Sequence, residues 1–263
     1  MKNAIVALTR GYPGEKSKYD TLIKRNNSIY LHFNKLRKFP AEIILFHEGN
    51  ISSEDQDYII DNSPEKIIFR SVSEYFGDTN LKLKDAERFS LGYRQMCRFH
   101  MFHIWKEVAD YDYILRVDED IEITKFNPLI FEYMNINNIN FMTGKFAKET
   151  HKLTNETLYK YLSEGIFENE LNNIYNQKFP YTNCYATNIN FWKNTDVYNK
   201  LKKIALSDEQ IINRWGDLVV LGVLLNYKNE KIKLFKKSQY SHFSHNSRVK
   251  NTFLRNLTLN SRA

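Results

Sequence analysis

The sequence predicts a single α/β domain, built on a mostly parallel β-sheet with helices on its faces. Three observations predict this class: short apolar runs alternate with segments of helical spacing, no internal repeat is visible, and no linker divides the 263 residues. A hydrophobic fraction of 42% supports a sizeable core and excludes a wholly disordered chain. Nine Gly and five Pro exclude collagen-like and low-complexity proteins.

In the first part of the chain, predicted strands alternate with predicted helices. Three short apolar, β-prone runs are expected to form buried strands: residues 4–8, 42–47 and 66–70. Residues 20–38 and 52–61 lie between them and space their apolar side chains as helices do. The turn-rich segment 9–14 directly follows the first run, as ligand-binding loops often do in open α/β sheets.

The remaining elements continue the pattern as far as residue 245. Residues 85–109 are expected to form a long helix, and 111–117 a strand with a brief continuation over 121–123. Further along we expect a helix or turn over 126–138, a strand over 141–146 and a polar helical region over 150–180. Two helices over 188–206 and 208–227 follow, and then a strand with a His-containing loop over 232–245.

The charge is unevenly distributed along the chain. The formal net charge of +7 alone suggests an anionic partner such as a nucleic acid, a membrane surface or a phosphorylated substrate. Nine Lys and Arg residues but one acid, Glu230, follow Asn226, so the preceding part of the chain is almost neutral. We therefore expect no nucleic-acid partner, and a basic end that helps to hold a diphosphate or contacts an anionic membrane peripherally.

Cysteine usage and hydropathy limit the cellular compartment. Cys97 and Cys184 are too few for a disulfide framework or a zinc site. The N-terminal apolar run is too short for a signal peptide, and no stretch of about 18 apolar residues could form a transmembrane helix. The prediction is a cytoplasmic protein, with peripheral contact with a membrane as an open alternative.

The strongest chemical signal is Asp118-x-Asp120, at the end of the strand expected over 111–117. Two carboxylates at i and i+2 across a turn can face one hard cation, and Mn²⁺ or Mg²⁺ prefers oxygen ligands while keeping places for phosphate oxygens. Such an ion, at the carboxyl end of a strand, could neutralise the diphosphate of a nucleotide sugar as it leaves. The alternative is an acidic turn without a ligand.

Two clusters near the C-terminal end could complete such a site. His242 or His245 could add a ring nitrogen to the metal sphere, although histidines on a basic surface tail are the simpler interpretation. Asp217 follows Arg-Trp-Gly and could contact a sugar hydroxyl or act as a base. An Asp at that place could equally favour the start of a helix.

A fourth cluster lies in the predicted helix 85–109. Arg94 and Arg98 could meet phosphate groups, and Tyr93 could stack or hydrogen-bond. The alternative is an ordinary amphipathic helix.

Five segments in chain order resemble the fungal α-1,2-mannosyltransferases of glycosyltransferase family 15: GYRQMCRF (92–99), YDYILRVDED (111–120), NINFW (188–192), RWGD (214–217) and QYSH (239–242). The first and fourth are specific, whereas the Asp-x-Asp triplet is shared by many glycosyltransferases. The resemblance covers roughly residues 4–245 and implies a GT-A fold in one domain over 1–263. It implies a nucleotide-binding half over 1–123, and an acceptor side with the basic C-terminal segment over 124–263.

The resemblance also implies an activity and a metal. The activity is retaining transfer of mannose from GDP-mannose to a glycan or glycolipid acceptor, assisted by Mn²⁺ (or Mg²⁺). Asp118 and Asp120 fall on the first and last positions of the family's Glu-Pro-Asp triplet, which contacts the metal, and His242 falls on the family's metal-binding His.

Roles at the nucleotide and the sugar follow from the same resemblance. Tyr93 and Arg98 match residues on the nucleotide-phosphate side, with Asp118 beside them. Arg10, after the first strand, stands where such folds contact the nucleotide. Asp217 matches the Asp of the family's Trp-Gly-Asp motif near the reacting sugar, and is the expected catalytic residue.

The sequence departs from the family at a second catalytic position. Tyr185 stands where the family has a Glu that is its proposed nucleophile, and no acid lies between Glu170 and Asp196. A same-face, ion-pair-like displacement needs no protein nucleophile, because the leaving phosphate oxygen can take the proton of the acceptor. The family's N-terminal membrane anchor also has no counterpart in the sequence.

Four alternatives stay open at this point. The enzyme could use another nucleotide sugar, or be a nucleotidyltransferase or other nucleotide-sugar enzyme with residues 10–16 as a loose phosphate loop. It could be a catalytically inactive relative, because Tyr185 replaces the family's acid. Finally, it could be a non-enzymatic basic protein that binds nucleic acid through its tail.

Overall fold

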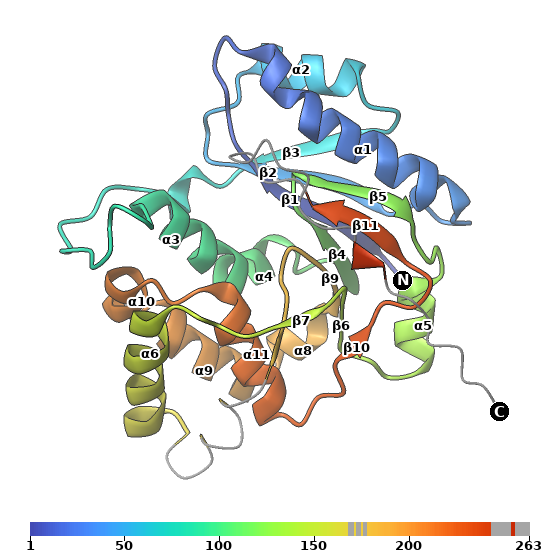
Figure 1. Ribbon diagram of the computed structural model, residues 1–263. Coiled ribbons are helices and arrows are strands. Elements are labelled where there is room, and N and C mark those ends of the chain that lie inside the picture. Colours follow the sequence, from blue (N-terminus) through green and yellow to red (C-terminus); the bar gives the residue numbers. More distant parts are fainter. Residues whose placement is uncertain (168–170, 172–174, 176–177, 243–253, 256–263) are drawn as a thin grey trace.

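The centre of the molecule is a seven-stranded sheet with the order β10-β6-β9-β4-β1-β2-β3 (Figure 1). The computed structural model describes residues 1–167, 171, 175, 178–242 and, for the backbone alone, 254–255. The strands are β1 (Asn3–Thr9), β2 (Glu42–His47), β3 (Ile67–Ser71), β4 (Tyr113–Val117), β6 (Phe141–Thr143), β9 (Cys184–Asn188) and β10 (Lys233–Leu234). The pairs β1–β2, β1–β4, β2–β3 and β10–β6 are parallel, which confirms the mostly parallel sheet.

Strand β9 is the antiparallel member of this sheet, and the sequence did not predict it. It lies between β4 and β6, is antiparallel to both, and pairs Tyr185 with Arg116 of β4. Its residues, CYATN, show neither an apolar run nor a clear alternation. Both partners of β9 are distant in the chain, so local pattern carried little information about it.

Two small sheets complete the strand structure. The strands β5 (Ile121–Lys125), β11 (Gln239–His242) and β12 (Leu254–Arg255) form one of them, and β7 (Phe146–Ala147) with β8 (Phe179–Pro180) forms the other. The expected continuation after Asp120 therefore exists, but it belongs to a separate antiparallel sheet. In that sheet His242 is paired with Ile121, which brings the C-terminal part of the chain to the acidic turn.

Helices cover both faces of the central sheet. On one face lie α1 (Asp20–His32), α2 (Ser53–Asp61) and α5 (Ile130–Ile136); on the other lie α3 (Leu91–Arg98), the π-helical η4 (Phe99–His103), α4 (Ile104–Glu107), α8 (Ile189–Lys193), α9 (Thr195–Ala205) and α11 (Asp217–Tyr227). Side chains of β1 pack alternately on the two faces of the sheet. Ile5 and Ala7 pack into the core beneath α1, whereas Ala4 and Val6 pack into the core on the side of α11.

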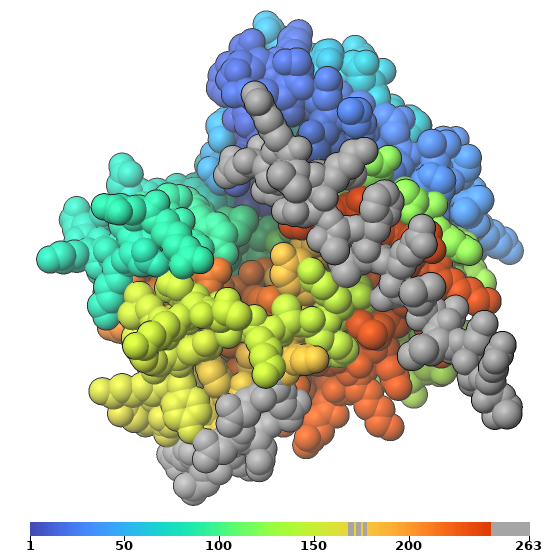
Figure 2. Space-filling model, in the orientation of Figure 1, coloured from blue at the N-terminus to red at the C-terminus, as the bar shows by residue number. Residues whose placement is uncertain are grey.

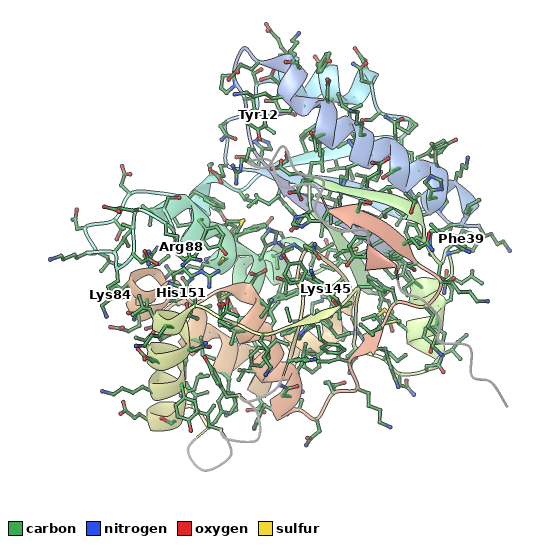
Figure 3. The ribbon with its side chains drawn as sticks, in the orientation of Figure 1. Tyr12, Phe39, Lys84, Arg88, Lys145 and His151 are labelled. Carbon is green, nitrogen blue, oxygen red and sulfur yellow. The ribbon has the colours of Figure 1, made fainter. Side chains whose placement is uncertain are left out.

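The remaining helical elements are shorter or peripheral: η1 (Lys16–Tyr19), η2 (Asn34–Leu36), η3 (Ser73–Tyr75), α6 (Lys152–Gly165) and α10 (Asp208–Asn213). The segment around α3 stands at one edge of the molecule in Figures 1 and 2. Phe39, beyond the end of α1, lies at the opposite edge, and Lys84, Arg88 and His151 gather near α3 and α6 (Figure 3).

Several predicted helices are shorter than expected, for local reasons. The helix predicted over 85–109 begins at Leu91, because the hydroxyl of Ser90 accepts a hydrogen bond from the amide of Tyr93 and caps it. The helix over 208–227 is broken at Arg214, whose φ of 58° is left-handed. The helix over 188–206 is interrupted at Asn194, which caps α9.

Two exclusions made from the sequence can be compared with the structure. Cys97 and Cys184 are buried free thiols, as expected. Within the described ranges, no helix is both long enough and apolar enough to cross a bilayer.

Candidate active site

A cleft of about 400 Å³ opens at the carboxyl ends of β1 and β4, which lie together because the two strands are parallel neighbours. We call it the first cleft. It is lined by Leu8, Thr9, Arg10, Gly11, Glu48, Asn50, Ser90, Gly92, Tyr93, Met96, His100, Arg116, Asp118, Glu119, Asp120 and His242. This is the edge at which open α/β sheets bind ligands.

A second cleft of about 350 Å³ adjoins the first. It is lined by Tyr93, Met96, Arg116, Asp118, Ala147, Lys148, Glu149, Tyr181, Thr182, Asn183, Arg214, Gly216, Asp217, Leu218 and His242. Tyr93, Met96, Arg116, Asp118 and His242 line both clefts, so the two spaces meet at these side chains. A molecule in one cleft would therefore lie next to a molecule in the other.

The backbone of the acidic turn is held from two sides. The amide of Asp118 donates to the carbonyl of Asn183 at 3.0 Å, and the amide of Ile121 donates to the carbonyl of Asp118 at 3.1 Å. From α1, the fully buried guanidinium of Arg25 donates to the carbonyl of Val117 at 2.9 and 3.1 Å. These bonds fix the exit of β4 and so the direction in which the carboxylates leave it.

Arg116 connects the two clefts electrostatically. Its Nε donates to Oδ1 of Asp118 and its Nη1 to Oδ2 of Asp217, both at 2.7 Å, and its side chain is 4% exposed. Burial lowers the pKa of Arg116, but the two carboxylates outweigh that effect and raise it above its usual value. Burial raises the pKa of Asp118 to about 6, although Arg116 opposes the shift.

Asp120 and His242 meet at the mouth of the first cleft. Nε2 of His242 lies 3.3 Å from Oδ2 of Asp120, and the hydrogen bond to this carboxylate raises the pKa of the imidazole. Across the described ranges, no group of three or more His, Cys, Asp or Glu side chains is assembled closely enough to hold a metal ion. The Asp118, Asp120 and His242 side chains nevertheless offer the oxygen and nitrogen donors that Mn²⁺ accepts.

The net charge of the first cleft tests whether a cation fits there. Two arginines face four carboxylates in its lining: Arg10 and Arg116 against Glu48, Asp118, Glu119 and Asp120. Burial also raises the pKa of the Glu48 carboxyl, and a nearby cation would oppose that shift. An anionic diphosphate would be repelled by this lining unless a cation accompanied it, so the residues present fit a divalent ion.

Glu119, the middle residue of the acidic turn, holds the loop after β1. One of its oxygens accepts hydrogen bonds from Oγ1 of Thr9 at 2.7 Å and from the amide of Arg10 at 3.1 Å. The side chain of Arg10 is 62% exposed and reaches within 3.9 Å of the other oxygen. Arg10 lines the first cleft, and its guanidinium stays accessible to a ligand, so its contact with a nucleotide stays a prediction.

Tyr93 and Asp217, two further predicted site residues, also line the clefts. Tyr93 projects from α3 into both clefts, and its hydroxyl accepts a hydrogen bond from Nη2 of Arg214 at 2.8 Å. Nη1 of Arg214 pairs with Glu149 at 2.8 Å. Asp217 lines the second cleft and is the first residue of α11, so it also serves the helix start that was its alternative interpretation.

Arg98 lies elsewhere. Its Nε donates to the side chain of Gln210 at 2.9 Å and its Nη2 to the carbonyl of Ser207 at 3.0 Å, so it holds the start of α10. It is not in the lining of either cleft described above. Five residues of an α-helix turn through about 500°, so Arg98 projects about 140° away from Tyr93.

Tyr185 is enclosed in the core. Its exposed fraction is 0%, its ring stacks on Phe141 with centroids 4.8 Å apart, and the guanidinium of Arg116 lies 5.8 Å from its ring. It too is not in the lining of either described cleft, although it is paired with Arg116 across β4 and β9. His245 and the later basic residues of the tail fall outside the described side chains.

Sequence reasoning missed Arg116, Arg214 and Asn183 as residues of this site. Arg116 did leave a signal, since it is a lone charge in the apolar strand YILRV and a buried arginine needs partners. Arg214 stood within the RWGD motif but was not singled out. Asn183 carried no signal, because asparagine is common in this chain and β9 itself was not predicted.

Comparisons with known proteins support this description. No family model matches the chain. The probable mannosyltransferase KTR3 of Saccharomyces cerevisiae is 27% identical over 158 residues, which are 51% of this chain and 37% of that protein. The chain thus spans little more than a third of the length of this curated relative.

Solved structures extend the likeness to the whole fold. Core-mannan synthase A (CmsA/Ktr4) of Aspergillus fumigatus, in its Mn/GDP form, gives a TM-score of 0.74 at 15% identity, covering 96% of this chain and 80% of that chain. The mannosyltransferase Ktr4p of S. cerevisiae gives 0.74 at 16%, covering 92% and 70%. The galactosyltransferase LgtC, with donor and acceptor sugar analogues, gives 0.53 at 12%, covering 88% and 72%. The chain has the GT-A fold, and over about half of its length it is similar to a probable mannosyltransferase.

Proposed function

We propose that this protein is a metal-dependent, retaining glycosyltransferase that moves mannose from GDP-mannose to a glycan acceptor. The observation that carries the proposal is the pair of adjoining clefts that meet at Asp118 and His242. A transferase needs two neighbouring binding spaces, one for the donor and one for the acceptor. The names of the relatives, a probable mannosyltransferase and a synthase solved in a Mn/GDP form, favour mannose and GDP.

The first cleft is the proposed donor site. Arg10 and Tyr93 lie where they could contact the nucleotide diphosphate. Asp118, Asp120 and His242 would hold Mn²⁺ or Mg²⁺, for which the negative lining is suited. The bound ion would supply positive charge to the diphosphate as it leaves.

The second cleft is the proposed acceptor site. Asp217 faces it and is oriented by Arg116, so its carboxylate could position an acceptor hydroxyl. The bond from the acceptor oxygen to the anomeric carbon forms as the bond from that carbon to the phosphate oxygen breaks. The leaving phosphate oxygen takes the hydroxyl proton, which requires no nucleophile from the protein. The enclosed position of Tyr185 supports this route.

Substitution of Asp120 by Ala tests the donor site. We expect transfer to be abolished, and the rise in Tm produced by GDP with Mn²⁺ to be lost, because one of three metal-binding groups is removed. The matched control is Glu122→Ala, two residues further on, where the side chain is exposed on β5. Unchanged turnover in Asp120→Ala would overturn the metal assignment.

A thermal-shift panel of nucleotide sugars, each with and without Mn²⁺, tests the donor. A response to GDP-mannose that requires Mn²⁺ is the expected result. A response to a UDP-sugar instead would identify another donor, and stabilisation by GDP and Mn²⁺ without hydrolysis or transfer would identify an inactive relative. Salt-sensitive binding of DNA or RNA without nucleotide-sugar binding would favour the nucleic-acid alternative, which the acidic lining of the first cleft does not support. A glycolipid acceptor, peripheral membrane contact and a cytoplasmic location stay predictions.

A further inference from the structure

Exposed apolar side chains gather at one edge of the molecule, where the chain leaves α1 and where α5 begins. Among the described residues, five large apolar side chains are more than half exposed, and four of them lie here, with exposed fractions of 55% to 78%. Two exposed lysines accompany them. We call this surface the η2–α5 edge and define it by Lys35, Leu36, Lys38, Phe39, Leu129 and Ile136.

Arg37 joins the two segments that form this edge. Its Nη1 donates to the carbonyl of Pro128, which directly precedes Leu129, and its Nη2 pairs with Glu132 at 3.0 Å. Glu132 lies three residues after Leu129 and four before Ile136, a spacing that places the three on one side of α5. The apolar side chains of both segments therefore border the same surface. A group of exposed apolar side chains is typical of an interaction site, whereas single ones are not.

The η2–α5 edge is also positively charged. Residues 21–41 contain five Lys or Arg and no acid, and Lys35 and Lys38 are exposed. Nζ of Lys38 lies 5.4 Å from the centre of the Phe39 ring, so charge and apolar surface adjoin. The acid of α5, Glu132, is already paired with an arginine. The part of the chain before the basic C-terminal end is almost neutral, so these cations are a local concentration.

The combination of charge and apolar surface indicates the partner. Two copies of the chain docked through the same edge would bring Lys35 and Lys38 against the same lysines. The residues after Asn226 carry nine basic groups and one acidic group, so the edge would repel them as well. A nucleic acid would pair with the lysines but would gain little from the three aliphatic side chains. An anionic bilayer fits both parts, because lysines contact lipid phosphates while apolar side chains enter the boundary between headgroups and acyl chains.

We propose that the η2–α5 edge docks the protein on an anionic lipid surface, with its apolar side chains in the headgroup region and its lysines on lipid phosphates. Phe39 lies just before β2, at the amino end of that strand, whereas the first cleft lies at the carboxyl ends of β1 and β4. Because these strands are parallel, the edge and the first cleft lie at opposite ends of the sheet. In Figure 3, Phe39 stands at the periphery, well apart from Tyr12 in the loop after β1. Docking would therefore leave the first cleft open, and the proposal does not depend on the proposed function.

Co-sedimentation of the full chain with lipid vesicles tests the lysines. We expect binding to vesicles of phosphatidylcholine and phosphatidylserine in equal parts, and much weaker binding to vesicles of phosphatidylcholine alone. The double substitution Lys35→Glu and Lys38→Glu should weaken binding to the anionic vesicles about 30-fold or more, because two attractive charges become repulsive. The matched control is Lys202→Glu with Lys203→Glu, which changes the net charge equally at exposed positions of α9, on the other face of the sheet. It should weaken binding only a few-fold.

Phe39→Ser tests the apolar part of the edge. Binding to the anionic vesicles should weaken about 10-fold, because the ring is no longer there to leave water on docking. Leu206→Ser, at the exposed end of α9, is the control and should bind as the wild type does. Tm should be the same in all these variants, since the substituted side chains are exposed.

Two results of the vesicle experiment would overturn the proposal. One is equal weakening by the η2–α5 substitutions and the α9 controls, which would assign binding to overall charge; the other is no preference for the anionic vesicles. Dimerisation of the wild type that Phe39→Ser abolishes, without vesicle binding, would instead make the edge an interface between copies. Transfer to a soluble acceptor should be equal in the wild type and the edge variants, so failure of docking and failure of the proposed function are distinguishable.

Discussion

Two buried arginines support the end of β4 from opposite faces of the sheet, and they do so differently. Arg25 reaches from α1 and binds the carbonyl oxygens of Val117 and Val6. Arg116 lies on β4 itself and binds the carboxylates of Asp118 and Asp217. Burial lowers the pKa of Arg25 to about 10, because carbonyl dipoles do not balance its charge as two carboxylates balance that of Arg116.

The two arginines therefore have different roles: Arg25 supports the fold, and Arg116 orients side chains of the clefts. The bonds of Arg25 end on the backbone of Val117 and Val6 and on the side chain of Asn26, none of it a side chain that lines a cleft, so its loss should be measured mainly as stability. The bonds of Arg116 end on side chains that line the clefts, so its loss should also be measured in the reaction. Three substitutions test this distinction, from the largest expected effect to the smallest.

Arg116→Met should have the largest effect. It leaves Asp118 and Asp217 without their buried counter-charge, which should cost about 3–5 kcal/mol of unfolding free energy. Transfer by the remaining folded protein should be lost, since both carboxylates lose their orientation. Urea denaturation and initial rates normalised to folded protein measure the two effects. Normal rates after that correction would make Arg116 a framework residue like Arg25.

Arg25→Met should come second. It removes the buried hydrogen bonds of the guanidinium to two backbone carbonyls and to the side chain of Asn26, at a cost of about 2–4 kcal/mol in unfolding free energy. Turnover per folded molecule should change only a few-fold, because no side chain of either cleft is bound by Arg25. The same two measurements apply, and a loss of turnover at unchanged stability would remove the distinction between the two arginines.

Arg98→Gln should have the smallest effect. Its side chain is part-buried, holds the start of α10 and contacts no residue of the acidic turn, so we expect a loss of about 1 kcal/mol and an unchanged KM for GDP-mannose. Titration of GDP in the presence of Mn²⁺ provides an independent check. A tenfold weaker GDP affinity would restore the role on the nucleotide-phosphate side that the sequence predicted for Arg98.

The sequence predicted the parts of the molecule that depend on local pattern. Strands β1 to β4 follow from apolar runs, and Asp118 and Asp120 follow from their place at the end of one of them. His242 reaches them because β11 pairs with β5. The resemblance implied a metal-binding role for His242, but neither it nor periodicity predicted this pairing. The separate directions of Tyr93 and Arg98 follow from their five-residue spacing in α3, whereas the resemblance placed both on the nucleotide-phosphate side. The positions of Tyr185 and Asn183 depend on β9. The partners of this strand are distant in the chain, and its composition does not indicate a strand.

The hydrogen bond from the amide of Asp118 to the carbonyl of Asn183 gives the two clefts a shared piece of backbone. Movement of Asp118 toward a ligand in the first cleft would displace Asn183, which lines the second cleft. Coupling of this kind is reciprocal, so occupation of either cleft should alter the affinity of the other by the same factor. In steady-state kinetics this would appear as a KM for each substrate that depends on the concentration of the other.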